Sequence, residues 1–465
     1  MFDRSSHARP SLTEGLTQHL MQAVDTKSRR RALLHWLDWL SCVAGALNSP
    51  AAQALHRWRM PGPSPAKWPN LAGQADSPMQ ALYIEAGLAN VLEMDDFFRE
   101  AVLHPGPAVL PVVAHGVRYG GLNVTGALDA VVRGYEASIR VGLTLGSGHY
   151  AHWHNTATAG VFGAAAAAAS AWGLTHEQTV WALGNAGTQS AGLWQVRLEN
   201  VMSKQLHTGH AAWAGLSAAS LAQAGFTGPR FILEGECGFY AAMCTNPQPD
   251  RLLEPDETWK IHNTSFKPWP ACRHTHPTID AVLALREGTD NSRPLEFDDM
   301  VVGTFADALK ICHHSNPKTP TERKFSLPYV AAATAQWGPL KPEHFEDAAA
   351  QSLDLWALMT RIRVEVDAEA NRFYPRHFGA TVQIQKHGVV QEHRVVDALG
   401  DPEQPLSMPQ LFEKARVLMT HGGLQPERIE SVLRATSQLM DQLDEPDLQT
   451  AMPLELVSPL IPLEP

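Results

Sequence analysis

Residues 207–229 read HTGHAAWAGLSAASLAQAGFTGP, a stretch rich in Ala, Ser and Gly that contains no Asp, Glu, Lys or Arg. We expect a helix over residues 209–225. A second run of small residues, from Thr156 to Trp172, is also predicted to be helical. Two such helices can approach closely, because no bulky side chains separate their backbones. These two segments favour an all-α domain in this part of the chain.

Further signals for helices surround these two segments. Ser11-Leu-Thr-Glu14 and Thr175-His-Glu-Gln178 have the form of capping boxes, which mark helix N-termini. Apolar residues between Leu33 and Leu40 recur at helical spacing, so one face of that segment should be buried. The segment from Ser407 to Leu443 is predicted to be helical again.

The pattern changes after Pro268, where strands are expected. Residues 301–306 are predicted to form a short strand, and residues 361–366 alternate polar and apolar side chains as a half-buried strand does. Residues 381–386 and 389–396 flank His387-Gly388, which fits a two-residue hairpin turn. The predicted fold class is therefore mainly α with a smaller α+β domain. We expect a helical domain over 1–265, completed by C-terminal helices over 405–465, and an α+β domain over 266–404.

Composition restricts the class of protein. The 465 residues are 44% hydrophobic and 18% charged, as in a folded globular protein, and the formal net charge is −11. This balance argues against a nucleic-acid or anionic-membrane partner, which would favour a basic face. Five scattered cysteines without a C-x-x-C pair suit a reducing compartment. The N-terminus lacks the apolar core of a signal peptide, so a cytoplasmic location is expected.

Several polar groups stand in apolar or small-residue surroundings. Glu93, Asp95 and Asp96 precede His104, and adjacent carboxylates beside aromatic residues can act as acid or base or orient a histidine. The alternative is a solvated helix end. His154 and Thr156 lead into the Ala-rich run, where a helix N-terminus would favour an anion. The alternative is that Thr156 only caps that helix.

Three more groups could carry chemistry. Lys204 and His207 stand i, i+3 and share a helix face, which would offer a point charge for a carboxylate, although Lys204 could equally extend to water. Arg273 and His276 lie at the proposed domain junction, a common place for small-molecule sites. Tyr329 could donate to an enolate oxygen, or be an ordinary half-buried tyrosine. Neither G-x-G-x-x-G nor a P-loop follows a predicted strand, so nucleotide binding has no support.

Taken together, these segments resemble the MmgE/PrpD family. The resemblance runs in order from about residue 30 to 400. It rests on residues 207–229, followed by Ile-Leu-Glu-Gly235 and Gly238-Phe239, and on four further motifs: His154-x-Thr-Ala-Thr-Ala-Gly160, Gly187-Thr-Gln189, Pro270-x-Cys-Arg…His276…Asp280-Ala and Phe325-Ser-Leu-Pro-Tyr329. The family includes 2-methylcitrate dehydratase, cis-aconitate decarboxylase and iminodisuccinate epimerase. The resemblance implies a helical domain, an α+β lid and a homodimer.

The resemblance also implies which residues form the site. The expected catalytic residues are His104, His154, Lys204, His276 and Tyr329, and the expected substrate-binding residues are Glu93, Asp95, Asp96, Thr156, His207 and Arg273. Lys204 and His154 would hold substrate carboxylates, His104 or His276 would move the proton, and Tyr329 would stabilise an enolate-like state. Arg273 could form a bidentate contact with another carboxylate. No cofactor and no metal are expected, and the partner is a small polycarboxylate.

The chain departs from the family at places that line the substrate pocket. Many members have Asp-x-Asp-Asp-Thr where this chain has Glu93-Met-Asp95-Asp96-Phe97, which lacks the threonine hydroxyl and begins with a longer acid. The stretch between Asp96 and His104 is one residue longer than in the aconitate decarboxylases, and Asn155 replaces a frequent proline. These departures leave the identity of the substrate undecided, but they do not change the expected class of reaction.

Several functions remain open. The leading expectation is dehydration of a 2-methylcitrate-like hydroxy acid, followed by decarboxylation of a cis-aconitate-like acid or epimerisation of an aminodicarboxylate. All three share transfer of a proton at the carbon next to a carboxylate. A helical terpene-cyclase-like enzyme with Mg²⁺ at Asp95, Asp96 and Glu100 is an alternative of another class. A metal hydrolase built from some of the 22 histidines and a family member without catalysis also remain.

Overall fold

The computed structural model describes residues 9–58, 77–199, 201–287, 293–312, 314–444 and 448–457. The chain divides into two compact units. The first unit comprises Met1–Val91, Ala101–Thr264 and Gly422–Pro465, and the second comprises Leu92–Glu100 and Ser265–His421. Helices dominate and one small mixed sheet accompanies them, which confirms the predicted fold class. Within the described ranges, no helix has the length and apolar character needed to cross a membrane.

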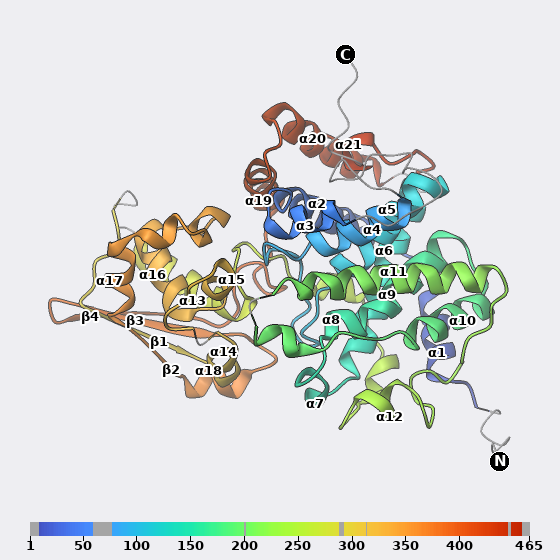
Figure 1. Cartoon of the computed structure of the whole chain (residues 1–465), viewed down its shortest axis with the longest axis horizontal. Helices are drawn as coiled ribbons and strands as arrows, with labels where there is room; N and C mark the ends of the chain where they lie inside the picture. The colour runs from blue at the N-terminus through green and yellow to red at the C-terminus, as the bar shows by residue number, and fades with distance from the viewer. Residues whose placement is uncertain are drawn as a thin grey trace. The chain divides into compact units, whose positions relative to one another are not determined.

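The first unit is helical (Figure 1). Its helices are α1 (Leu12–Leu20), α2 (Thr26–Gly45), α3 (Pro50–Arg57), α4 (Pro78–Leu88), α5 (Gly106–Gly120), α6 (Val124–Leu143), α7 (Ser147–Tyr150), α8 (Asn155–Thr158), α9 (Gly160–Ala171), α10 (His176–Gly187), α11 (Ser203–Gln223), α12 (Phe239–Met243), α20 (Pro426–Gln442) and α21 (Leu454–Val457), with 3₁₀ turns η2 (Trp194–Arg197), η3 (Pro249–Leu253) and η4 (Lys260–Asn263).

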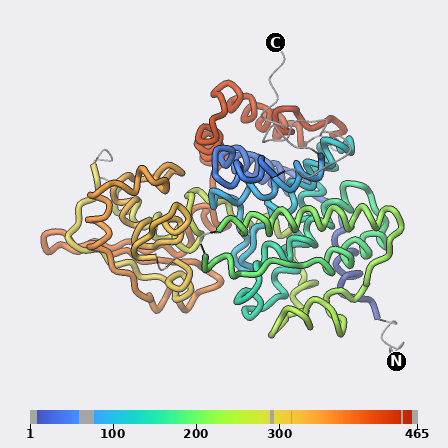
Figure 2. Tube along the Cα trace, in the orientation of Figure 1, coloured from blue at the N-terminus to red at the C-terminus, as the bar shows by residue number. Residues whose placement is uncertain are grey.

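The two small-residue helices are neighbours in the first unit, as predicted. α9 and α11 run side by side (Figure 1, Figure 2), and α9 also packs on α6. A Cβ added at Gly215 of α11 would lie 2.3 Å from the Cβ of Ala164 and 2.6 Å from the backbone nitrogen of Ala165. Real carbon atoms meet at about 3.5–4.0 Å, so only glycine allows this approach. Small residues therefore set the spacing of the helices on which the predicted site residues stand.

Helix boundaries in this unit differ from the expectations in two places. The predicted helix over 156–172 is interrupted: α8 is a single turn that ends at Thr158, and α9 begins at Gly160. α11 begins at Ser203 and therefore includes Lys204, upstream of the predicted start. Both capping boxes are confirmed, because Ser11 and Thr175 each bond reciprocally with the residue three positions on.

The second unit combines helices with a mixed sheet (Figure 1). Its elements are η5 (Arg273–Thr275), α13 (His276–Arg286), β1 (Asp299–Thr304), α14 (Ala306–Ile311), α15 (Pro320–Lys324), α16 (Leu327–Trp337), η6 (Pro342–Phe345), η7 (Ala349–Gln351), α17 (Leu353–Met359), β2 (Ile362–Val366), α18 (Ala368–Phe373), β3 (Ala380–Lys386), β4 (Val389–Val395) and α19 (Met408–His421).

The strands of this sheet follow the order β2-β1-β3-β4. β1 runs parallel to β2 and antiparallel to β3, with Met300 opposite both Ile362 and Ile384. Side chains on one face of β1 and β3 are buried against α13 and α16 and form the core of the unit. The predicted hairpin is confirmed: β3 and β4 are joined at His387 and Gly388, whose φ angles of 49° and 80° suit a tight two-residue turn.

Two segments that were predicted to belong to the helical domain lie in the second unit. Leu92–Glu100 is attached there by the backbone bridge between Phe97 and Ser265. α19 is attached by Lys414, whose Nζ donates to the carbonyl oxygen of Met94 at 2.6 Å. Both attachments join residues far apart in the sequence. The chain thus enters the second unit twice.

Candidate functional site

Buried His154 is the centre of a polar group in the first unit. Its side chain is 2% exposed, and its backbone N–H donates to the carbonyl oxygen of Gly192 at 2.9 Å. The imidazole Nδ1 lies 3.2 Å from Nδ1 of His207 on α11. The ring also packs on the indole of Trp194, with centroids 4.3 Å apart. These contacts fix the position of the His154 ring and bring together two predicted site residues that are distant in sequence.

Thr156, His104 and Lys204 complete this group. The backbone N–H of His104 donates to Oγ1 of Thr156 at 3.0 Å, so the loop before α5 is anchored beside α8. Lys204 stands in the first turn of α11, one turn before His207. The first unit thus gathers His104, His154, Thr156, Lys204 and His207.

Burial and positive charge together keep the imidazoles of His154 and His207 neutral. Burial, followed by the charges of Lys204, His207 and His104, holds the pKa of His154 well below its ordinary value. Burial and the charge of Lys204 lower the pKa of His207 to about 4. At neutral pH the group therefore offers the neutral imidazoles of His154 and His207, the hydroxyl of Thr156 and the Lys204 ammonium. A carboxylate is the ligand that suits a lysine and neutral N–H donors.

The acidic residues predicted for the site lie in the second unit. Glu93, Asp95 and Asp96 are all buried, and Glu93 adopts a positive φ of 57°. The carboxylate of Glu93 lies 3.5 Å from Nζ of Lys267, which is fully buried. Sequence reasoning did not select Lys267. The signal was its place between Phe266 and a Pro-Trp-Pro stretch, where a lysine has little access to water.

A buried thiol was also missed. Sγ of Cys272 lies 3.3 Å from Nδ1 of His274. Burial raises the pKa of Cys272, but hydrogen bonds with Cys312 and His274 and the charge of His274 outweigh burial and hold that pKa well below its ordinary value. Cys272 stands in the Pro270-x-Cys-Arg motif, but its residue type does not distinguish it from an ordinary core thiol, so only its neighbours in the structure reveal it.

His276 is fixed by hydrogen bonds on both ring nitrogens. Nη1 of Arg273 donates to His276 Nδ1 at 2.9 Å, and a guanidinium can only donate. Nδ1 is therefore the acceptor, and Nε2 carries the proton that goes to the carbonyl oxygen of Ala271 at 3.1 Å. Burial and the charge of Arg273 lower the pKa of His276 well below its ordinary value. Within this unit His276 is thus a neutral ring held in one tautomer, while its predicted role in proton transfer stays a prediction.

Arg273 is likewise engaged by its own unit. Its terminal nitrogens donate to the carbonyl oxygens of Ala398 and Leu399, and Nη2 lies 2.5 Å from the carboxylate of Asp401. The guanidinium is 2% exposed. These contacts hold the loop after β4 against η5, directly before α13, so the observed contacts of Arg273 are structural. The predicted contact with substrate stays a prediction.

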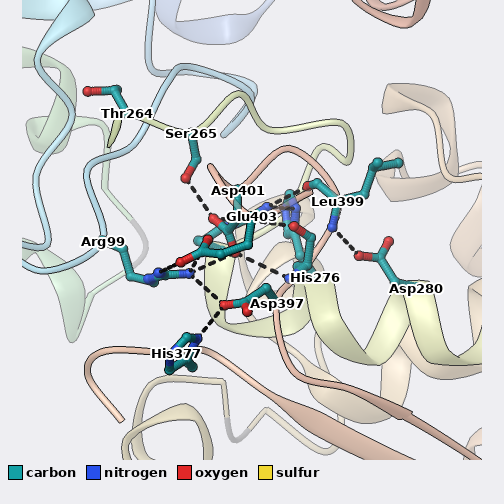
Figure 3. A network of polar contacts seen from close by, with 12 residues as sticks. Arg99, Thr264, Ser265, His276, Asp280, His377, Asp397, Leu399, Asp401 and Glu403 are labelled. Atoms are coloured by element: carbon teal, nitrogen blue, oxygen red, sulfur yellow. Dashed lines mark hydrogen bonds and ion pairs between the residues drawn. The ribbon is translucent and has the colours of Figure 1, made fainter. Parts of the chain in front are cut away.

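Asp401 is the acceptor at the centre of this network (Figure 3). It accepts from Oγ of Ser265 at 2.6 Å and lies 3.2 Å from Nη1 of Arg99. Arg99 also contacts Asp397 at 2.9 Å and Glu403 at 2.7 Å. Burial raises the pKa of Asp401, but the adjacent arginines outweigh this and hold it below its ordinary value. The network connects three separate segments of the second unit.

Tyr329 is also in the second unit and is fully buried. Its hydroxyl donates to the carbonyl oxygen of His344 at 2.6 Å. Burial raises the pKa of Tyr329 to about 12. The side chain therefore stays protonated at neutral pH, but its single O–H is engaged by His344, so the predicted role of Tyr329 as a donor to substrate stays a prediction.

One group of possible metal ligands occurs within the described ranges. His377, Asp397 and Glu403 place ligand atoms within 4.8 Å of one another. The guanidinium of Arg99 contacts both carboxylates of this group and offsets part of their negative charge. In the described part of the chain, Asp95, Asp96 and Glu100 do not form such a group. The acidic cluster required by the terpene-cyclase alternative is therefore not seen there.

Comparison with known proteins points to one family. Residues 11–252 match the model of the MmgE/PrpD N-terminal domain, and residues 269–439 match that of the MmgE/PrpD C-terminal domain. A cis-aconitate decarboxylase-like protein of Aspergillus oryzae is 24% identical over 404 residues, which cover 82% of this chain and 83% of that protein. The human cis-aconitate decarboxylase is 25% identical over 400 residues, 80% of this chain and 79% of that protein. The Aspergillus terreus cis-aconitate decarboxylase is 27% identical over 232 residues, 46% of each chain.

Proposed function

Because this chain belongs to the MmgE/PrpD family, we propose that it is a lyase for a small di- or tricarboxylic acid. The reaction begins with removal of a proton from the carbon next to a carboxylate. The observation that carries the proposal is the group around the buried ring of His154, where the ammonium of Lys204, the neutral imidazoles of His154 and His207 and the buried hydroxyl of Thr156 are gathered. Such a group favours binding of a carboxylate, because charge-assisted hydrogen bonds are stronger beside a buried ring, where the dielectric constant is low, than they are in water.

In this proposal Lys204 and His154 hold a substrate carboxylate. A carboxylate next to the reacting carbon takes up charge as the C–H bond breaks, because the electron pair moves into an enolate-like system. Donors already in place at that carboxylate stabilise the charge without reorganisation. His104, anchored to Thr156 through its backbone N–H, is the proposed proton carrier of this unit.

Two fates of the enolate-like state are candidates. Loss of carbon dioxide is favoured by the names of the relatives, which are cis-aconitate decarboxylases. Loss of hydroxide from a 2-methylcitrate-like acid is the second candidate, because Phe97 separates this chain from many members of the family. This residue stands where many members have threonine, and its ring packs on Phe378 with centroids 6.1 Å apart, so the position supplies no hydroxyl. The pocket of this chain therefore differs chemically from that of a member with threonine.

Proton NMR in D₂O tests the proposal. Purified protein treated with EDTA is mixed with cis-aconitate, 2-methylcitrate, citrate and a panel of aminodicarboxylates. We expect deuterium exchange, a new alkene signal or loss of a carboxylate, without added metal or cofactor. Lys204→Met should lower kcat/KM by about a hundredfold, the equivalent of losing a buried charge-assisted contact. Lys27→Met, an exposed lysine on α2, serves as the matched control. Silence across the panel would contradict the proposal.

We also propose that the protein forms a homodimer in the cytoplasm. Support comes from apolar side chains at the surface of the first unit near the N-terminus of α11, where Leu193, Leu198 and Leu206 are 58%, 73% and 49% exposed. Exposed apolar surface of this kind is common at protein interfaces. Light scattering coupled to size-exclusion chromatography tests the assembly, and a monomer at micromolar concentration would contradict it.

A further inference from the structure

The contact between His154 and His207 is unusual because it joins two like nitrogens. Nδ1 faces Nδ1 at 3.2 Å. Both rings are neutral at pH 7, as argued above, and a neutral imidazole carries one proton on one of its two nitrogens. A hydrogen bond between the two Nδ1 atoms therefore requires that one ring donate and the other accept. The proton of the accepting ring must then be on Nε2.

The surroundings of each ring decide which one accepts. His154 is buried, and apart from the bond to His207 its ring makes no hydrogen bond within the described part of the chain. Its Nε2 is therefore the nitrogen left for a ligand. His207 is only partly buried and stands one turn after Lys204, so its own Nε2 can accept from water. An anion beside Lys204 needs a donor from His154, and that donor can only be Nε2–H.

We propose that His207 is a positioning residue: its Nδ1–H donates to Nδ1 of His154 and thereby holds His154 in the Nε2–H tautomer, which donates to a substrate carboxylate beside Lys204. This assignment replaces the predicted direct contact of His207 with substrate. It rests on the proposed function for the carboxylate, whereas the tautomer can be measured in the protein without substrate. In histidines generally, the hydrogen bond made by one ring nitrogen decides whether the other nitrogen carries the proton.

Side-chain nitrogen NMR of protein labelled with ¹⁵N-histidine tests the tautomer at pH 7. The signals of His154 are assigned by their loss in His154→Gln. His207→Asn places an amide nitrogen where Nδ1 stood and keeps the donor, while His207→Leu removes it. His210→Gln is the matched control on the same helix, since its amide nitrogen can replace the Nε2 that bonds the carbonyl oxygen of Gln189. We expect the Nε2–H tautomer in the wild type, in His207→Asn and in the control, and a tautomer mixture in His207→Leu.

Kinetics give the second readout. His207→Leu should raise KM for the carboxylic acid about tenfold with a smaller change in kcat, the effect expected from misaligning one hydrogen bond. His207→Asn should return KM to within about threefold of the wild type.

Each outcome decides one claim. A wild-type His154 with its proton on Nδ1, or a protonated ring, would overturn the positioning role, and so would an unchanged KM in a folded His207→Leu. If His207→Leu does not fold, the wild-type and His207→Asn spectra still decide the tautomer. If the expected tautomer is found but no carboxylic acid is turned over, the proposed function fails and the tautomer assignment stands.

Discussion

Gly215 sets the distance between α11 and α9, and a single methyl group there should be costly. In Gly215→Ala the new Cβ would lie 2.3 Å from the Cβ of Ala164, 2.6 Å from the Ala165 nitrogen and 2.8 Å from the Val161 carbonyl oxygen. Two of these three atoms are backbone, so no side-chain rotation relieves the overlap and the helices must separate. Overpacking of this severity costs about 3 kcal/mol, and alanine returns about 1 kcal/mol through its better helix propensity. We expect a net loss of about 2 kcal/mol.

Urea and thermal unfolding measure this loss against a matched control. Gly116→Ala is also a helical glycine, in α5, but its new Cβ would have ordinary contacts of 3.5 Å and 3.6 Å with Leu122 and Ala171. That variant should be as stable as the wild type or gain up to about 1 kcal/mol. A loss of about 2 kcal/mol should lower Tm by roughly 4–8 °C in a domain of this size. If Gly215→Ala were as stable as Gly116→Ala, the packing argument for the small-residue helices would be refuted.

The remaining predictions concern charge. In Lys204→Met the pKa of His207 should rise only part of the way from about 4 towards 6.5, because burial is the largest cause of the shift and remains. An NMR titration of the ring protons measures this pKa. An unchanged pKa would mean that the charge of Lys204 does not act on His207. Because the folded-state pKa of His207 lies below its unfolded value, the unfolded state binds more protons below about pH 6.5, so stability should be full above that pH and fall towards pH 4. Unfolding midpoints at pH 7 and pH 5 should differ less in His207→Asn than in the wild type, and equal differences would contradict this assignment. Arg99→Met should cost about 3 kcal/mol in urea unfolding, since it leaves the buried carboxylate of Asp397 without an arginine and leaves Asp401 with Arg273 alone; a loss under about 1 kcal/mol would mean that the network is not structural.

Local features of the fold were predictable, because their causes lie within a few residues. The hairpin at His387-Gly388 and the capping boxes are examples, since turn and cap chemistry acts over two to four positions. The break between α8 and α9 was not predictable from the Ala-rich run. At the break, Oγ of Ser190 donates to the carbonyl oxygen of Thr158, and just before α8 the backbone N–H of His154 donates to Gly192, so both partners lie far along the chain. Long-range bonds of this kind leave no periodic pattern in the sequence.

The site was predictable in its parts more than in its arrangement. The i, i+3 spacing of Lys204 and His207 identified a shared helix face. The orientation of His207 towards His154 depends on how α11 packs against its neighbours, and a pattern of adjacent residues does not predict that packing. In the same way, Arg273 was predicted to be a carboxylate ligand from its residue type. The acceptors that engage it, on the loop that includes Asp401, are more than a hundred positions downstream, so their proximity appears only in the folded chain.

The early segment Leu92–Glu100 has a consequence for biosynthesis. This segment belongs to the second unit, but its partners Ser265 and Asp401 are translated much later. At roughly 5–20 residues per second, the ribosome needs on the order of tens of seconds to supply them. During that time Phe97 and Phe98, both buried in the finished protein, have no native surface in their own unit to cover them. A nascent chain of this protein should therefore carry an apolar, chaperone-accessible stretch between two helical segments that are already complete, and expression at lower temperature or with added chaperone should improve its yield.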